Sequence, residues 1–174
     1  MAPVRGKAFI HLQDADGQAD LHQICLRLLK GSPFLCISKG FAPALIRFDC
    51  LPGGWHVVVM DAINEDYAEL NTQLLTPLIV DGIEAKIIEL HQQGFVHGDI
   101  QDTNVLVRKD RMKGFMLVDF DWAGEIGDVQ YPMNVNWGDD LWQPEGARDG
   151  KLILPDHDLE MLRHMLNTWL MLTL

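Results

Sequence analysis

The stretch from Phe95 to Gly124 constrains the fold of this chain more than any other part of the sequence. It contains two short apolar runs, residues 104–107 and residues 115–118, on either side of the polar, glycine-bearing segment 108–114. Two apolar runs that flank such a segment predict two short strands joined by a turn. We therefore expect a β-hairpin in the second half of the chain.

Acidic and amide side chains lie at one end of this expected hairpin. Asp99 and Asn104 come at the start of the first run, and Asp119 follows the second. In an antiparallel pair the start of one strand lies beside the end of the other, so these three side chains should converge. Oxygen ligands suit a hard cation, and Mg²⁺ is favoured because it takes one or two carboxylates and leaves positions for phosphate oxygens. The sequence therefore predicts a magnesium site at this end of the hairpin.

The same stretch resembles the catalytic core of the protein-kinase-like phosphotransferases. In that family the loop pattern His-x-Asp-x-x-x-x-Asn precedes a hairpin that ends in Asp-Phe-Gly. In this chain residues 97–99 read His-Gly-Asp, residue 104 is Asn, and residues 119–121 read Asp-Phe-Asp. Trp122 follows residues 119–121. The His-Gly-Asp form and the Asp-Phe-Asp-Trp form are more similar to aminoglycoside and choline kinases and to divergent fungal kinase-like proteins than to standard protein kinases.

The resemblance implies an α+β, protein-kinase-like fold that binds ATP with Mg²⁺. Asp99 would accept the proton of an attacking hydroxyl, while Asn104 and Asp119 would hold the metal ions that neutralise the phosphates. His97 would pack and order the loop without handling protons. Asp158 lies where the family places an aspartate that holds the catalytic loop through backbone hydrogen bonds.

The resemblance also implies one kinase-like domain with two unequal parts. Residues 1–62 would form a partial, β-rich N-lobe and the hinge, and Met60, Asp61 and Ala62 would present their backbone to the adenine ring. Residues 63–174 would form a mostly helical C-lobe, which contains the catalytic loop, the metal-binding hairpin, an activation-like segment and the final helix.

The chain departs from the family pattern in both parts. Gly98 replaces an arginine of the loop, so the loop has no cation to pair with a phosphorylated activation segment, and control by that route is not expected. Asp121 replaces a glycine. The Gly-rich loop, the strand lysine and the helix glutamate of the family are not found before Glu65. The resemblance therefore predicts a truncated N-lobe and poorly clamped phosphates.

Local patterns predict further elements. In chain order they are a strand within 4–12, a helix over 21–29 that stops at Gly31, two strands within 40–60 around a turn at 52–54, helix-compatible residues 63–73, a core helix that is capped by Thr76, starts at Pro77 and stops at Gly94, and a final helix capped by Asp156. The final helix reads as apolar nearly all round, which predicts self-association or another partner.

Composition limits the class of protein. Apolar residues make up 48% of the chain and charged residues 22%, as in an ordinary globular domain. The net charge of −11 argues against binding to nucleic acid. The three cysteines form an odd number, and no signal peptide or membrane span of about 18 apolar residues is evident, so we expect a cytoplasmic or nuclear protein with reduced thiols.

Three functions remain open from the sequence. The first is a phosphotransferase that moves the γ-phosphoryl group of ATP to a hydroxyl of a protein or a small molecule, with weak activity. Residues 142–145, Trp-Gln-Pro-Glu, resemble the Ala-Pro-Glu of protein kinases and favour a protein acceptor, whereas His-Gly-Asp favours a small molecule. The second is a pseudokinase or binding module that retains the fold without catalysis. The third is a metal-dependent hydrolase, which leaves the order of helix, loop and hairpin unexplained.

Overall fold

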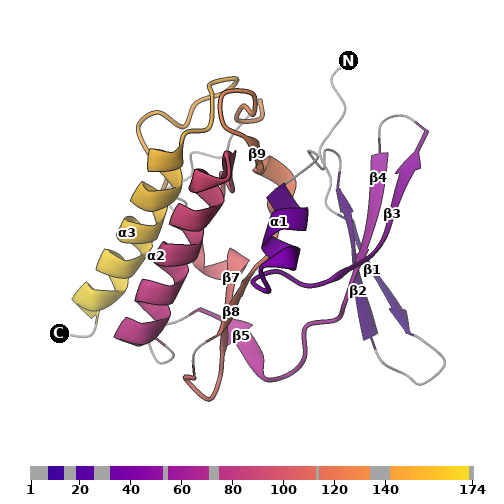
Figure 1. Cartoon of the computed structure of the whole chain (residues 1–174), viewed down its shortest axis with the longest axis horizontal. Helices are drawn as coiled ribbons and strands as arrows, with labels where there is room; N and C mark the ends of the chain where they lie inside the picture. Colours follow the sequence, from indigo (N-terminus) through magenta and orange to yellow (C-terminus); the bar gives the residue numbers. More distant parts are fainter. Residues whose placement is uncertain are drawn as a thin grey trace.

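The computed structural model of the chain describes residues 8–13, 19–25, 32–52, 55–70, 75–112, 114–133 and 142–172. A four-stranded sheet lies at one side of the molecule and the long helices α2 and α3 lie at the other (Figure 1). The elements in chain order are β1 Ala8–Gln13, β2 Ala19–Cys25, α1 Ser32–Ser38, β3 Leu45–Leu51, β4 Trp55–Met60, β5 Tyr67–Glu69, α2 Pro77–Gln92, β6 Phe95–Val96, η1 Asp102–Asn104, β7 Val105–Arg108, β8 Phe115–Leu117, η2 Phe120–Trp122, β9 Gly124–Glu125 and α3 Pro155–Leu172.

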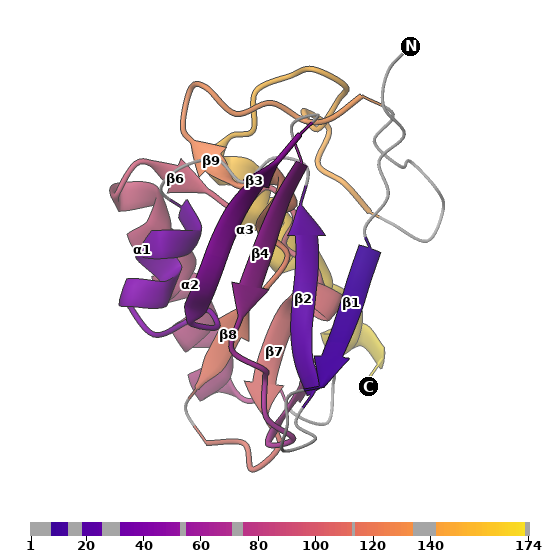
Figure 2. The same ribbon diagram turned by 90° about the vertical axis from the view of Figure 1, so that its right-hand side faces the viewer.

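The four-stranded sheet is antiparallel and has the order β1-β2-β4-β3 (Figure 2). The expected strand near the N-terminus is confirmed as β1, and the expected pair of strands within 40–60 is confirmed as β3 and β4. Val58 of β4 is buried and lies opposite Phe48 of β3. The β-forming run that ends at Met60 therefore lies inside the sheet, paired on both sides.

The helix expected over 21–29 is wrong for its first part, because Ala19–Cys25 forms the strand β2. This strand pairs with β1 along one edge and with β4 along the other. The spacing of Leu21, Ile24 and Cys25 is helical, but the two neighbouring strands satisfy the backbone groups of β2, and this pairing decides its conformation. Residues 26–31 lie outside the described part of the chain.

The short helix α1 packs against the helical part of the molecule. Its Cys36 is fully buried in the same apolar cluster as the inner face of α2. Directly after α1, Lys39 forms an ion pair with Glu89 of α2 at 2.9 Å. The carbonyl oxygen of Phe41 then accepts a hydrogen bond from the backbone N–H of Leu117 in β8 at 2.8 Å. The linker to β3 is thus fixed on the helical part before the chain enters the sheet.

The core helix α2 forms as the sequence predicts. The Thr76 side chain accepts a hydrogen bond from the N–H of Ile79 at 3.3 Å, and Pro77 occupies the first turn. After the helix, Gly94 has a φ of 87°, which favours glycine. The buried stripe of the helix consists of Ile79, Ile83, Ile87 and Leu90. The expected stop signals and apolar spacing are therefore both confirmed.

The expected hairpin is confirmed as β7 and β8, which pair in antiparallel register. Their buried residues alternate along each strand and face the core: Val105, Val107, Phe115 and Leu117. A third strand, β5, pairs with the outer edge of β7, so the helical tendency expected for 63–73 is wrong over 67–69. Residues 71–74 lie outside the described part of the chain.

The final helix α3 begins at Pro155, so Asp156 lies in its first turn and is not the cap. A negative charge is favoured there by the helix dipole. The helix packs on α2 through Met161, Leu162 and Met165, while the outer side up to residue 168 is polar: Asp156, Glu160, Arg163, Asn167 and Thr168. The helix is therefore amphipathic up to this point. The side chains from 169 on, on which the expected self-association now depends, lie outside the described part.

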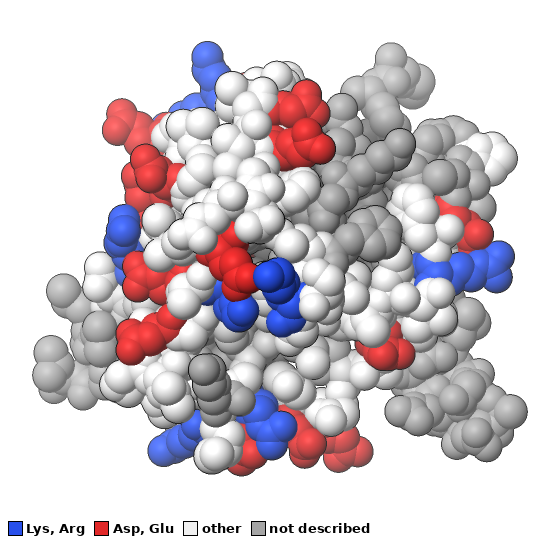
Figure 3. Space-filling model, in the orientation of Figure 1, with Lys and Arg blue, Asp and Glu red and all other residues white. Residues whose placement is uncertain are grey.

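Charged side chains of both signs are interspersed over the described part of one face of the molecule (Figure 3). Among the described residues, no helix has the length and apolar character needed to cross a membrane.

Candidate functional site

The loop from His97 to Asn104 connects the end of β6 to the start of β7. His97, Asp99 and Asn104 are all buried, with exposures of 0%, 7% and 5%. The side-chain amide of Asn104 donates to the carbonyl oxygen of Asp99 and to its carboxylate Oδ2, both at 3.0 Å. Asn104 therefore closes the loop and holds the predicted base in place.

Asp119 lies at the same end of the hairpin, just after β8. The N–H of Val118 donates to the carbonyl oxygen of Asn104 at 3.0 Å, which brings the backbone on either side of the site together. Asp119 itself has φ 65° and ψ 64°, a left-handed conformation that is uncommon for a residue other than glycine. Such strain is typical of functional sites, because the surrounding structure must enforce it.

The hydrogen bonds of its two ring nitrogens determine the tautomer of His97. Its Nδ1 lies 3.3 Å from the backbone N–H of Asp99, which can only donate. Its Nε2 lies 3.1 Å from the carbonyl oxygen of Val118, which can only accept. The proton of the neutral ring is therefore on Nε2, and the ring, which also packs on Phe120 at 4.9 Å, ties the loop to the strand before Asp119.

Asp158 of α3 is fully buried beneath this loop. Its Oδ2 accepts from the N–H of His97 at 2.9 Å, and its Oδ1 accepts from the N–H of Gly98 at 2.7 Å. The Nε2 of His91, at the end of α2, lies 2.9 Å from the same Oδ2. The contact between His91 and Asp158 has no signal in the sequence, because the two residues lie on different helices.

Gly98 lies in a space that admits no side chain. Its φ is 84°, and a Cβ atom would lie 2.9 Å from Cδ1 of Ile153 and 3.1 Å from the carbonyl oxygen of Trp122. The sequence shows that glycine stands here where protein kinases have an arginine. The structure adds the reason, since Ile153 and Trp122 occupy the space beside the loop.

The donor set at the end of the hairpin fits a magnesium ion. No three His, Cys, Asp or Glu side chains of the described residues are grouped closely enough to hold a metal by themselves. The Nδ2 of Asn104 is used on Asp99, which leaves its Oδ1, 3.5 Å from the Thr103 hydroxyl, as the atom that could bind a metal together with the carboxylate of Asp119. One amide oxygen and one carboxylate, completed by phosphate and water oxygens, are the kind of site in which Mg²⁺ binds with nucleotide.

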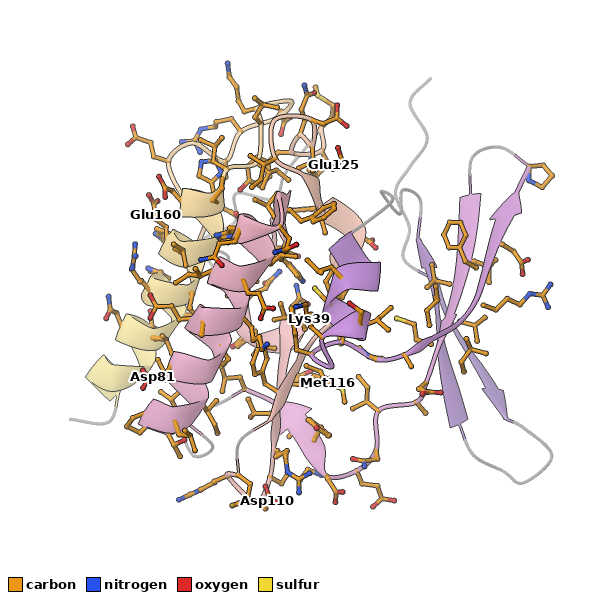
Figure 4. All side chains as sticks on the ribbon, viewed as in Figure 1. Lys39, Asp81, Asp110, Met116, Glu125 and Glu160 are labelled. Atoms are coloured by element: carbon orange, nitrogen blue, oxygen red, sulfur yellow. The ribbon has the colours of Figure 1, made fainter. Side chains whose placement is uncertain are left out.

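Two of the three expected hinge residues, Asp61 and Ala62, line a pocket, and Met60 does not. The N–H of Asp61 donates to the carbonyl oxygen of Ala44 at 2.8 Å, so this group is already used inside the protein. The pocket has a volume of about 180 Å³ and is lined by Ala42, Pro43, Ala44, Asp61, Ala62, Ile63, Asn64, Tyr67 and Met116. Figure 4 labels Met116 in this region. The lining includes none of Asp99, Asn104 and Asp119, and the volume is below the about 300–1,000 Å³ of typical ligand sites, so we do not identify this pocket with the whole nucleotide site.

The groups that clamp phosphates in the family have no counterpart in the described N-terminal elements. β2 contains no lysine or arginine, and α1 contains no acidic residue. Lys39 and Lys86 both pair with Glu89, and their ammonium groups lower the pKa of this carboxyl to about 2. Lys39 therefore supports the attachment of α1 to α2.

The segment after Asp119 is fastened to the loop and to α3. β9 pairs with β6, and Gln130 forms a β-bridge with Leu152. The hydroxyl of Tyr131 lies 3.0 Å from Nδ1 of His157, and burial, together with the charges of Asp158 and Asp99, raises the pKa of Tyr131. Further along, Trp142 of the Trp-Gln-Pro-Glu run stacks on His164 at 4.2 Å. Residues 134–141 lie outside the described part.

Comparison with known proteins shows similarity in structure. No family model and no curated protein sequence matches the chain. The structure is similar to the PK-1 kinase of Cydia pomonella granulovirus, with a TM-score of 0.61 and 15% identity over 92% of this chain and 69% of that one. It is similar to vaccinia related kinase 3, with a TM-score of 0.58 and 14% identity over 97% of this chain and 69% of that one. The fold expected from the sequence is confirmed by these similarities.

Proposed function

Because the chain has a protein-kinase-like fold, we propose that it is a Mg²⁺-dependent phosphotransferase core that transfers the γ-phosphoryl group of ATP to a hydroxyl. Asp99 accepts the proton of the attacking hydroxyl, and Asn104 and Asp119 hold the metal that neutralises the phosphates. The adenine lies near the hinge at Met60, Asp61 and Ala62.

One observation carries this proposal. The loop and hairpin keep Asp99 and Asn104 in contact at 3.0 Å beside a strained Asp119. Burying Asp99 and Asn104 is costly, and a protein that used the fold only for its shape does not require them. Positioning and metal charge account for most of the catalysis in this kind of reaction, and this end of the hairpin would supply both once Mg²⁺ is bound.

A pseudokinase is the second candidate, and it is favoured because β2 and α1, as described, carry no counterpart of the groups that clamp phosphates in kinases. β2 has no lysine to hold the phosphates, and α1 has no glutamate to position such a lysine. In this alternative Asp99 and Asn104 order the loop, and the protein acts by binding a partner. Low turnover, due to loosely held phosphates, is expected if the first candidate holds.

The two candidates differ in the response to nucleotide. We expect millimolar ATP to raise the melting temperature of the wild-type protein only with Mg²⁺ present, since ligand at 100 times its Kd adds about 2.7 kcal/mol of stability. Asp119→Ala should abolish this rise, whereas Asp110→Ala, on the exposed turn of the hairpin, should retain it. No rise in the wild-type protein would reject nucleotide binding and favour the pseudokinase.

A further inference from the structure

The strand β3 lies at one edge of the four-stranded sheet (Figure 2). Among the described residues it pairs with β4 alone, so the backbone N–H and C=O groups of its other edge point away from the sheet. The pairing with β4 is irregular between Leu45 and Arg47 and regular from Arg47 to Leu51. A regular edge of this kind is a template to which a further strand can be added.

Two opposite charges flank the centre of β3. Arg47 precedes Phe48 and Asp49 follows it, and the alternation of side chains along a strand places both charges on one face. The two side chains form an ion pair with each other, yet they keep exposures of 69% and 40% and so remain accessible to a second molecule. Charges of a single sign on an edge strand repel another copy, whereas this edge carries both signs.

We propose that β3 is the surface through which two copies of this chain form a dimer. The run Arg47-Phe48-Asp49 is complementary to itself when two copies run in opposite directions. In an antiparallel pair of β3 strands centred on Phe48, Arg47 lies opposite Asp49 of the partner subunit, and Asp49 lies opposite Arg47 of the partner subunit. Opposite charges on directly opposed residues stabilise a strand pair, and like charges destabilise it.

The symmetry and the size of this contact define the expected dimer. A two-fold axis at Phe48 uses the same surface of both copies, which joins the two sheets into one and closes the contact at two subunits. One added strand is a small contact beside the about 1,200–2,000 Å² that stable complexes bury. We therefore expect a reversible dimer that forms as the protein concentration rises. The proposal is independent of the proposed function, because β3 contains none of the site residues.

Charge reversal tests the pairing. Sedimentation of the wild-type protein at increasing concentration should show a monomer–dimer equilibrium. Arg47→Asp and Asp49→Arg each place like charges opposite one another in both cross-strand pairs, so the Kd of dimerisation should rise about tenfold or more in each variant. An equimolar mixture of the two variants restores opposite charges in both pairs and should recover the dimer. The double variant with both substitutions should dimerise as the wild-type protein does.

The mixture also separates pairing between copies from stability within one copy. Each single variant loses the ion pair inside its own β3, and mixing cannot restore that ion pair. Asp81→Arg makes the same change in charge as Asp49→Arg but lies on the exposed face of α2, away from the sheet (Figure 4). This control variant should dimerise with the wild-type Kd.

Three results would each overturn the proposal. The first is a wild-type protein that stays monomeric up to millimolar concentration. The second is a dimer that persists unchanged in both single variants, which would place the association on another surface, such as the final helix. The third is a mixture of the two single variants that stays as monomeric as each variant alone.

Discussion

At the scale of single residues, the loop requires a glycine at position 98. Gly98 carries the positive φ of 84° and lies against Ile153 and Trp122, so it meets two separate constraints. Gly94 has a similar φ of 87° but has no atoms within 4 Å of its Cβ position. The two glycines therefore separate backbone strain from crowding.

We expect Gly98→Ala to lower the free energy of unfolding more than Gly94→Ala does. Backbone strain of about 1 kcal/mol applies to both variants, and overpacking adds about 1–3 kcal/mol in Gly98→Ala alone. Urea denaturation of the two variants and the wild-type protein measures the difference. Equal losses would mean that Ile153 and Trp122 move aside without cost.

At the scale of elements, those with a signal inside their own segment were predicted correctly. Those that depend on pairing between distant segments were not. The cap at Thr76 and the alternation along β7 and β8 are local, so α2 and the hairpin were predicted, and the antiparallel register then placed Asp99, Asn104 and Asp119 at one end. β2 and β5 became strands because distant strands pair with them, and short apolar runs do not reveal this. The hydrogen bond from Gln101 to Asp99 depends on a side-chain conformation, which spacing does not determine.

The attachment of α1 to α2 is expected to depend on pH. The pKa of Glu89 is lowered to about 2 by Lys86 and Lys39, so the ion pairs stabilise the fold fully above the ordinary carboxyl pKa of about 4.5 and are lost as the pH falls towards 2. Glu89→Gln should therefore lower the melting temperature at pH 7. The difference in melting temperature between the variant and the wild-type protein should become smaller below pH 4.5. Added salt should narrow it also, since these groups are exposed to solvent. A difference that stays constant with pH would contradict the role of the pairs.

At the scale of the whole molecule, one carboxylate joins the helices to the site. Asp158 extends from α3, meets His91 of α2, and accepts the N–H groups of His97 and Gly98 in the loop. The loop in turn holds Asp99, and His97 reaches the strand before Asp119. The packing of α2 on α3 is therefore coupled to the geometry of the proposed metal site.

We expect Asp158→Ala to lower both stability and nucleotide binding. The substitution leaves the two buried N–H groups of His97 and Gly98 without their acceptor, and each buried donor left unsatisfied costs about 1–3 kcal/mol. Urea denaturation should show this loss, while Glu160→Ala, on the exposed side of the same helix, should stay within about 0.5 kcal/mol of the wild-type protein. The variant should also show a smaller Mg²⁺-dependent rise in melting temperature with ATP than the wild-type protein does. Without the hydrogen bonds to Asp158, the loop no longer holds Asn104 beside Asp119. Full nucleotide binding together with the lost stability would show that the loop keeps its geometry without α3 and would confine Asp158 to a role in stability.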